Sequence, residues 1–267
     1  MDARALARLV ENVEAAAYAD LLRAAPAEWR CEAEDTPAGW LLRAPALDAL
    51  LFNRIVAAGV NAPATREAVD AIVDRLRSAG VKNYGLQLSP AAEPREIDEW
   101  LSASGLVPRD RWTKVFRGAE PAPRMVTEYS ITQATPGDRD GFAAVAAAGF
   151  GMPPPWCAWL GGTIGRPGWR HYLAWQARQP VACAAIYVHG DAGWLGVATT
   201  ISSARGRGAQ GALMARRIED GLSLGCKWFV TETGEDTPAK PNPSFRNMIR
   251  AGFTVAYHRQ NFMPPKG

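Results

Sequence analysis

The sequence has 267 residues, of which 48% are hydrophobic and 21% charged. These are the proportions of a globular protein with one large or two small domains, not of a disordered chain. The formal net charge of +3 does not favour nucleic acid or a membrane surface as a partner. Because no stretch approaches the roughly 20 apolar residues of a membrane-spanning helix, we expect a cytoplasmic protein.

The N-terminal 22 residues predict an amphipathic helix, because apolar residues recur at helical spacing around Asp2, Glu11 and Glu14. These charges argue against a signal peptide. The other elements predicted in this half are a strand at 51–56, a helix from Val69 to Leu76 ending before Gly80, a strand at 83–88, a helix at 93–103 ending before Gly105, and a strand at 112–116.

Residues 118–126 (GAEPAPRMV) are rich in Pro, Gly and Ala. This composition is typical of a linker. We therefore place a domain boundary there, between a domain at 1–120 and a domain at 127–267.

The second half predicts a longer series of elements. They are a strand at 127–133, a helix at 138–149, three strands of a meander at 171–176, 180–187 and 193–201, a helix at 206–224, a strand at 226–232, a helix at 243–251 and a strand at 253–260. On the helix at 206–224, Met214 and Ile218 mark the apolar face, and Arg217 and Asp220 are predicted opposite to it.

The two halves share the order helix, glycine, strand, helix, glycine, strand. Gly80 and Gly105 end the helices of the first half, and Gly225 and Gly252 those of the second. This agreement favours two copies of one fold, although an unrelated α/β chain can show the same order.

The segment that carries chemistry follows the predicted strand at 193–201. Arg205-Gly206-Arg207-Gly208 begins a glycine-rich turn that opens an amphipathic helix. Glycines let the backbone approach a ligand, and the first helical turn offers unpaired N–H groups at the positive end of the helix dipole. These features suit a pyrophosphate.

Other interpretations of this turn are open. A P-loop would need a Lys-Ser/Thr pair, which is missing here. Gly206, Gly208 and Gly211 match the G-x-G-x-x-G pattern of dinucleotide-binding folds, but the turn follows a strand meander and not the first strand of a βαβ unit. A tight turn without a ligand is the third possibility.

The turn resembles the acetyl-CoA signature [RQ]-x-x-G-x-[GA] of the GNAT N-acetyltransferases, with Gln210 in place of the final Gly or Ala. The segment from Asn242 to Phe253 resembles that family's N-x-x-[AS]…GF helix, which lies against the pantetheine arm. The resemblance covers about residues 127–267. The corresponding loop of the first half, residues 61–66 (NAPATR), lacks glycine, so we interpret the first half as a degenerate copy.

The resemblance implies an α/β (α+β) class and a tandem GNAT fold, with a mixed, mostly antiparallel twisted sheet flanked by helices in each half. It also implies an acyltransferase that moves an acetyl group from acetyl-CoA to an amine of an unidentified acceptor, either a small molecule or a protein. The cofactor-binding residues that it implies are Ala198, Thr199, Thr200, Arg205, Gly206, Arg207, Gly208, Ala209, Gln210, Gly211 and Asn242.

The resemblance leaves the acid and base chemistry open. Glu232 ends the strand beside the central one and is the candidate catalytic base, whereas a solvated edge carboxylate is the alternative. The family's usual acid, a tyrosine, corresponds to Met248 here, and Tyr257 is a possible substitute. Five aromatic residues are candidates for an acceptor pocket or for ordinary core packing: Trp156, Trp159, Trp169, Tyr172 and Trp175.

Four cysteines and three histidines are scattered without metal-ligand spacing, so we predict no metal. Two further hypotheses remain beside the enzyme: a non-catalytic acyl-CoA-binding or sensor module, and an NAD(P)-dependent oxidoreductase. An internal pseudo-dimer makes a monomer the first expectation and a homodimer the second.

Overall fold

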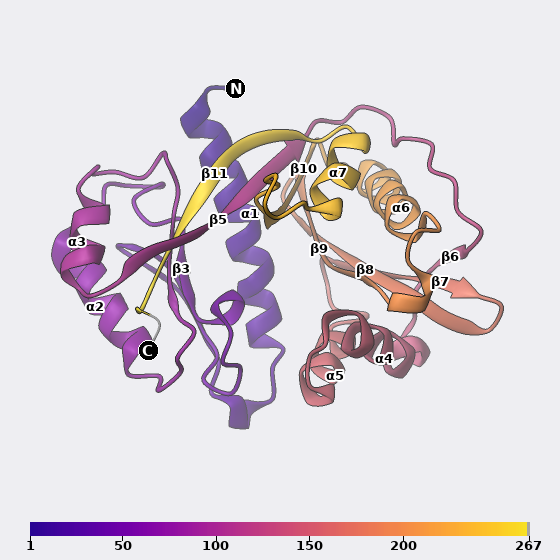
Figure 1. The fold of residues 1–267 in the computed structure, drawn as a ribbon, viewed down its shortest axis with the longest axis horizontal. Helices are drawn as coiled ribbons and strands as arrows, with labels where there is room; N and C mark the ends of the chain where they lie inside the picture. Colours follow the sequence, from indigo (N-terminus) through magenta and orange to yellow (C-terminus); the bar gives the residue numbers. More distant parts are fainter. Residues whose placement is uncertain (266–267) are drawn as a thin grey trace. The chain divides into compact units, whose positions relative to one another are not determined.

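The computed structural model describes residues 1–265 (Figure 1). The chain forms two compact units. The first unit comprises Met1–Val115, Glu232–Asn242 and the chain from Val255 onward, and the second comprises Phe116–Thr231 and Pro243–Thr254. The first break falls just before the predicted linker, but two later segments belong to the first unit. The units are therefore not consecutive stretches of the chain.

The strands of the first unit follow the order β1-β2-β3-β4-β11-β5. The β3–β4 pair is parallel, and the β1–β2, β2–β3 and β4–β11 pairs are antiparallel. The elements are α1 (Ala3–Arg23), η1 (Ala27–Trp29), β1 (Glu32–Thr36), β2 (Gly39–Arg43), η2 (Leu50–Phe52), β3 (Arg54–Val56), α2 (Arg66–Arg77), β4 (Gly85–Leu88), α3 (Ile97–Ala103), β5 (Val107–Arg117) and β11 (Thr254–Met263).

A core of apolar side chains joins α2 and α3 to these strands. Val69, Val73 and Leu76 are buried on the inner face of α2, at the helical spacing that the sequence shows, and they cluster with Leu86 and Leu101. Figure 1 shows α2 and α3 side by side.

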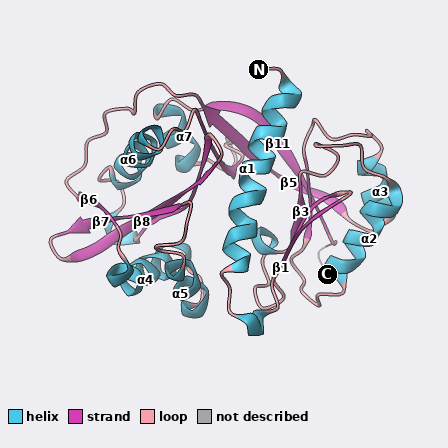
Figure 2. Ribbon diagram, turned by 180° about the vertical axis from the view of Figure 1, so that it is seen from behind, coloured by secondary structure: helices cyan, strands magenta, loops and turns pink. Residues whose placement is uncertain are grey.

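The strands of the second unit follow the order β10-β9-β8-β7-β6. Strands β7 to β9 form the predicted antiparallel meander, β6 pairs with β7 antiparallel, and β10 pairs with β9 in parallel. Helices α4 and α5 lie on one side of the meander and α6 on the other (Figure 2). The elements are β6 (Ser130–Gln133), η3 (Pro136–Asp138), α4 (Arg139–Phe150), α5 (Pro154–Gly162), β7 (Trp169–Gln176), β8 (Gln179–His189), β9 (Ala192–Thr200), η4 (Ser202–Ala204), α6 (Ala209–Ser223), β10 (Trp228–Gly234) and α7 (Pro243–Arg250).

The predicted α/β class with a mostly antiparallel sheet flanked by helices is confirmed. Among the α-helices and strands, three were not predicted. Helix α5 begins in the Pro-rich segment, and Pro154 and Pro155 are tolerated because the first helical turn needs no N–H donors there. Strand β1 is polar (EAEDT), so it lacks the apolar alternation that reveals a strand, and β2 follows it in a hairpin.

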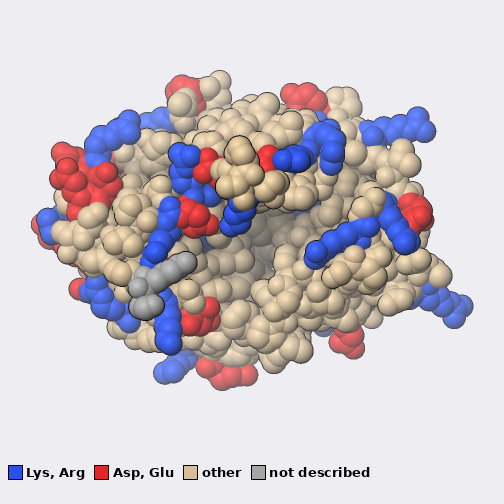
Figure 3. Space-filling view, in the orientation of Figure 1, with Lys and Arg blue, Asp and Glu red and all other residues tan. Residues whose placement is uncertain are grey.

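The polar face predicted for α6 is wrong at one position. Arg217 is only 1% exposed, so its guanidinium lies in the core of the second unit and not in solvent. On the molecular face in Figure 3, Lys and Arg alternate with Asp and Glu, in agreement with the small net charge. Within residues 1–265, no helix combines the length and apolarity needed to cross a membrane.

His171 is a buried neutral histidine on β7. Its Nε2 lies 2.9 Å from the hydroxyl of Thr163, which itself donates to the carbonyl of Leu160 at 2.6 Å. The hydroxyl must therefore accept from Nε2–H, which assigns the tautomer. Trp169 stacks on the ring with centroids 5.5 Å apart. Burial lowers the pKa of His171 to about 3.

We expect this histidine to make the protein acid-sensitive. Between the ordinary pKa of about 6.5 and the folded value of about 3, the unfolded chain binds more protons, so the free energy of unfolding falls as the pH falls. At pH 5, about 1.5 units below the ordinary pKa, the free energy of unfolding is lower by about 2 kcal/mol, because each pKa unit corresponds to about 1.4 kcal/mol. Urea unfolding at pH 7.5 and pH 5 should show a smaller loss in His171→Gln, which keeps an N–H donor for Thr163. An equal loss in both proteins would contradict the assignment.

Candidate functional site

The turn between β9 and α6 requires glycine at two positions. Gly206 and Gly208 have φ of +79° and +81°, a left-handed conformation that side chains disfavour. A Cβ on Gly208 would lie 2.2 Å from the carbonyl oxygen of Val126. Gly208 is therefore fixed by close backbone contact, whereas a Cβ on Gly206 would meet no heavy atom within 4 Å.

This turn and the start of α6 present a row of backbone donors. Among the described residues, the N–H groups of 206–211 have no acceptor, and the first bond of the helix runs from the N–H of Ala212 to the carbonyl of Gly208. They lie at the positive end of the α6 dipole. Unpaired donors at a helix start fit the oxygens of an anion such as pyrophosphate.

A cavity of about 610 Å³ opens beside these donors. Nine of the predicted cofactor residues line it: Ala198, Thr199, Thr200, Arg205, Gly206, Gly208, Ala209, Gln210 and Gly211. The lining also contains Pro243, Ser244, Asn247 and Arg250 of α7, the helix that the resemblance connects with the pantetheine arm. Met125 and Val126 of the linker and Ala204 of η4 line it as well, and the sequence did not predict them as cofactor residues.

Two arginines line the cavity. Arg205 is held in place by a bond from its Nε to the carbonyl of Thr200 at 3.1 Å. Arg250 is bonded to Asn247, which also lines the cavity. The third candidate, Arg207, points elsewhere and pairs with Glu128 at 2.9 Å. The cavity thus combines two positive side chains with unpaired backbone donors.

The departure from the signature at Gln210 is accommodated locally. The Gln210 amide donates to the hydroxyl of Thr200 at 2.9 Å. Both residues line the cavity, so the side chain ties the helix start to the end of β9.

Two predicted residues, Asn242 and Glu232, belong to the first unit and are not among the cavity-lining residues. The Asn242 amide donates to the hydroxyl of Thr233 at 2.9 Å and to the carbonyl of Gly234 at 2.6 Å. Its predicted role toward pantetheine remains a prediction.

Glu232 lies in a network of buried charges. Its side chain is 10% exposed and forms ion pairs with Arg259 at 2.6 Å, Lys114 at 2.9 Å and Arg54 at 3.4 Å. Two carboxylates of α1, both 0% exposed, join them: Glu14 pairs with all three cations and Glu11 with Arg259. The network holds three carboxylates and three cations, and we call it the buried ion network.

The cations of this network keep one of its carboxylates, Glu14, in the charged form. Burial by itself would raise the pKa of Glu14. Arg259, Lys114 and Arg54 together lower that pKa by more than burial raises it, so it lies well below the ordinary value. Tyr257, the possible substitute acid, donates its hydroxyl to Glu11 at 2.8 Å. Met248 is buried and has no hydroxyl to offer.

The aromatic residues considered for an acceptor pocket pack mainly in the core. Trp159, Trp169 and Tyr172 are 5%, 1% and 0% exposed, and the Tyr172 hydroxyl donates to Asp220 at 2.8 Å. None of the five candidates lines the 610 Å³ cavity. Their arrangement supports ordinary core packing over an acceptor pocket in this cavity.

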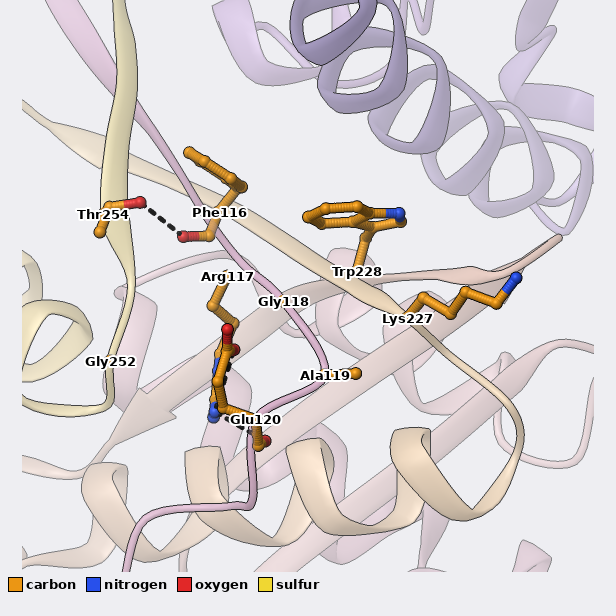
Figure 4. A pocket seen from close by; sticks show the side chains of 9 residues that line it. All are labelled: Phe116, Arg117, Gly118, Ala119, Glu120, Lys227, Trp228, Gly252 and Thr254. Carbon is orange, nitrogen blue, oxygen red and sulfur yellow. Dashed lines mark hydrogen bonds and ion pairs between the residues drawn. The ribbon is translucent and has the colours of Figure 1, made fainter. Parts of the chain in front are cut away.

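A second cavity, of about 440 Å³, lies near the start of β10 (Figure 4). Phe116 and Trp228 approach each other there with ring centroids 6.4 Å apart. Arg117 donates to the carbonyls of Glu120 and Pro121 at 2.8 and 3.1 Å, which fixes the start of the linker. Because its residues include no helix start with unpaired N–H groups, we assign the anion site to the first cavity.

Within residues 1–265, no group of histidine, cysteine and acidic side chains has the arrangement of a metal site. All four cysteines are free thiols, and burial raises the pKa of Cys183 to about 12. They are packed side chains.

Comparison with known proteins finds likeness in structure alone. Neither models of known families nor curated proteins match the sequence. Among solved structures, a GCN5-related N-acetyltransferase from Kribbella flavida aligns over 97% of this chain and 96% of its own, at 14% identity and TM-score 0.65.

Two further structures agree with this likeness. A GCN5-related N-acetyltransferase from Sphaerobacter thermophilus aligns over 74% of this chain and 64% of its own, at 19% identity and TM-score 0.58. A tandem GNAT protein from the clavulanic acid biosynthesis pathway aligns over 80% of this chain and 76% of its own, at 15% identity and TM-score 0.56. The chain therefore has the GNAT fold.

Proposed function

We propose that this GNAT-fold chain binds acetyl-CoA in the cavity beside α6 and transfers the acetyl group to an amine. The observation that carries the proposal is the run of unpaired N–H groups at 206–211 in a cavity that two arginines line. A pyrophosphate needs several donors and positive charge in one place, and this arrangement supplies both.

The backbone of β9 supplies the second part of the proposed site. Ala198, Thr199 and Thr200 line the same cavity as the turn. The parallel pairing of β9 with β10 runs to Trp194 and Val230. At the next residue, the Thr231 hydroxyl donates to the carbonyl of Leu195 at 2.6 Å. Main-chain groups of β9 past this point would hold the pantetheine arm and polarise the thioester carbonyl.

The reaction needs an unprotonated amine as nucleophile and a thiolate as leaving group. Glu232 is the proposed base. Its ion pairs with Arg259, Lys114 and Arg54 hold the carboxylate in one position. Because a CoA thiolate is a good leaving group, the absence of a tyrosine at Met248 does not prevent the transfer.

We propose that the first unit does not hold a second acetyl-CoA. Its corresponding loop, 61–66, is occupied by its own side chains. Asn61 exchanges amide bonds with Asn12 at 2.9 Å, and Arg8 donates to the carbonyl of Val60 at 3.2 Å. Thr65 accepts from the N–H of Ala68 and so caps α2. Because the helix start is already capped, the loop offers an anion fewer donors than the turn at 206–211.

The competing functions receive less support. Strand β9 connects through α6 to a parallel β10, as in a dinucleotide-binding unit, but its other neighbour, β8, is antiparallel. That neighbour argues against a doubly wound NAD(P) site. A non-catalytic acyl-CoA-binding module needs the same cavity, so only a test of turnover separates it from the enzyme.

Thiol release from acetyl-CoA tests the proposal. The protein is incubated with acetyl-CoA and a panel of small amines and lysine-containing peptides, and free CoA and acetylated amine are measured together. We expect equal amounts of both products with at least one amine, and rates that rise with pH as the amine loses its proton. Binding of acetyl-CoA without thiol release from any amine would favour the non-catalytic module, and binding of NAD(P) in its place would favour the oxidoreductase.

A further inference from the structure

Arg217 is a buried cation with no role in the reaction proposed above. It is 1% exposed on α6, and no carboxylate within residues 1–265 lies within ion-pair distance of it. Burial lowers its pKa to about 10. A buried guanidinium without a carboxylate is costly, so its acceptors must compensate.

The hydrogen-bond acceptors of Arg217 among the described residues are backbone carbonyls. Nε donates to Leu213 on the preceding turn of α6 at 3.1 Å. Nη1 donates across to the sheet, to Ala185 on β8 at 3.1 Å and to Gly196 on β9 at 3.4 Å. Ala185 and Gly196 are paired residues in the β8–β9 register. The guanidinium therefore joins α6 to one cross-strand pair.

That pair borders a β-bulge. Cys183 pairs with Thr199, and Ala185 pairs with Gly196. Between these pairs β8 has only Ala184, whereas β9 has Val197 and Ala198. The extra residue re-aims the strand directly before the Ala198–Thr200 segment that lines the cavity.

The bulge is strained. Val197 has φ of +49°, a left-handed conformation that is a real outlier for a β-branched residue. Such a conformation persists only where its surroundings hold it, and strained residues of this kind cluster at functional sites. The restraints here are the Arg217 bonds and a contact of the Cys183 sulfur with the Val197 carbonyl at 3.8 Å.

We infer that Arg217 is a positioning residue that holds this bulge and so sets the direction of the Ala198 and Thr199 main-chain groups. The inference rests on the proposed acetyl-CoA site, because those groups matter only if they meet the pantetheine arm. Arg217 itself is not among the residues lining the cavity, so it acts through the strand.

Two ligands separate positioning from folding. Acetyl-CoA carries the pantetheine arm, whereas adenosine 3′,5′-bisphosphate carries phosphates without it. In Arg217→Met we expect the affinity for acetyl-CoA to fall about tenfold, the effect of losing the bonds that hold one strand, while the affinity for the bisphosphate is unchanged. Arg217→Lys, which keeps the cation, should recover part of the loss.

The matched control is Arg216→Met on the same helix. Arg216 is a partly exposed cation that pairs with Asp220 at 2.9 Å, and no bond joins it to β9. The Arg216→Met substitution should leave the affinities for acetyl-CoA and for the bisphosphate unchanged. An unaltered acetyl-CoA affinity in Arg217→Met, or an equal loss for both ligands, would overturn the inference. If Arg217→Met does not fold, Arg217→Lys must show the same split between ligands with a smaller loss.

Hydrogen exchange provides a test that needs no ligand. In the free protein, amides at 196–199 should exchange faster in the Arg217 variants than in the unsubstituted protein or in Arg216→Met. Equal exchange would refute the positioning role even if acetyl-CoA binds. Failure of the unsubstituted protein to bind acetyl-CoA, with faster exchange in the variants, would instead refute the proposed function.

Discussion

Gly206→Asp is expected to weaken acetyl-CoA binding by roughly 100-fold or more. Gly206 lines the cavity, and a Cβ there meets no heavy atom within 4 Å, so a side chain fits without a clash. Its φ of +79° is one that Asp and Asn tolerate better than other residues. A carboxylate about 4 Å from a phosphate charge costs about 4 kcal/mol at an effective dielectric constant of about 20, which exceeds the roughly 2.7 kcal/mol of a 100-fold change.

The control for this substitution is Gly206→Asn, which has nearly the same shape and backbone preference without the charge. We expect it to lose less than about tenfold in affinity. Calorimetric titration at low ionic strength measures both variants, since salt screens the repulsion. If Asp and Asn reduced the affinity equally, steric change and not an anion site would explain the effect. Gly208 is unsuited to this test because any side chain there meets the Val126 carbonyl.

Arg259→Met is expected to destabilise the protein by about 3–5 kcal/mol, the usual effect of removing one partner from a buried ion pair. Arg259 is 0% exposed and donates to Glu11, Glu14 and Glu232 at 2.6–2.9 Å. Without it, Glu14 and Glu232 keep Arg54 and Lys114, whereas Glu11 keeps no ion pair with a cation among the described residues. Denaturant unfolding at pH 7 measures the change.

Arg111→Met is the matched control in the same unit. Arg111 pairs with Glu235 at 2.6 Å, but its side chain is 50% exposed, so its loss should cost at most about 1 kcal/mol. Equal destabilisation by the two substitutions would contradict a special role for burial. Glu14 also predicts acid sensitivity, because its pKa is lowered in the folded protein and its stabilising charge is lost as the pH falls.

Much of the fold could be predicted from local patterns. The periodicity of Val69, Val73 and Leu76 gave α2, and glycines with positive φ, such as Gly225 and Gly252, follow the helix ends. The cofactor residues were predictable because they are nearly contiguous from Ala198 to Gly211, and one strand, one turn and one helix start bring them together.

The remaining features depend on contacts between distant segments. Met125 and Val126 reach the cavity from the linker, and no local pattern predicts that contact. The bulge at Val197 exists only in relation to its partner strand. Arg217 was predicted on a polar face because charged residues usually face solvent, and its burial depends on carbonyl acceptors that the sequence does not display.

The buried ion network shows the same limit. Glu11 and Glu14 read as polar positions of an amphipathic helix, yet both are 0% exposed. Their partners come from β3, β5 and β11, at least 40 residues away in the sequence in each case. Only the folded arrangement reveals that the charges compensate one another.

Calorimetric titration of the full chain with acetyl-CoA tests the central claim most directly, because it gives affinity and stoichiometry together. We predict one site per chain, since the turn at 206–211 offers unpaired donors and the loop at 61–66 is filled by its own side chains. Two sites would contradict the degenerate first copy. No binding at high micromolar acetyl-CoA would contradict the acyltransferase proposal itself.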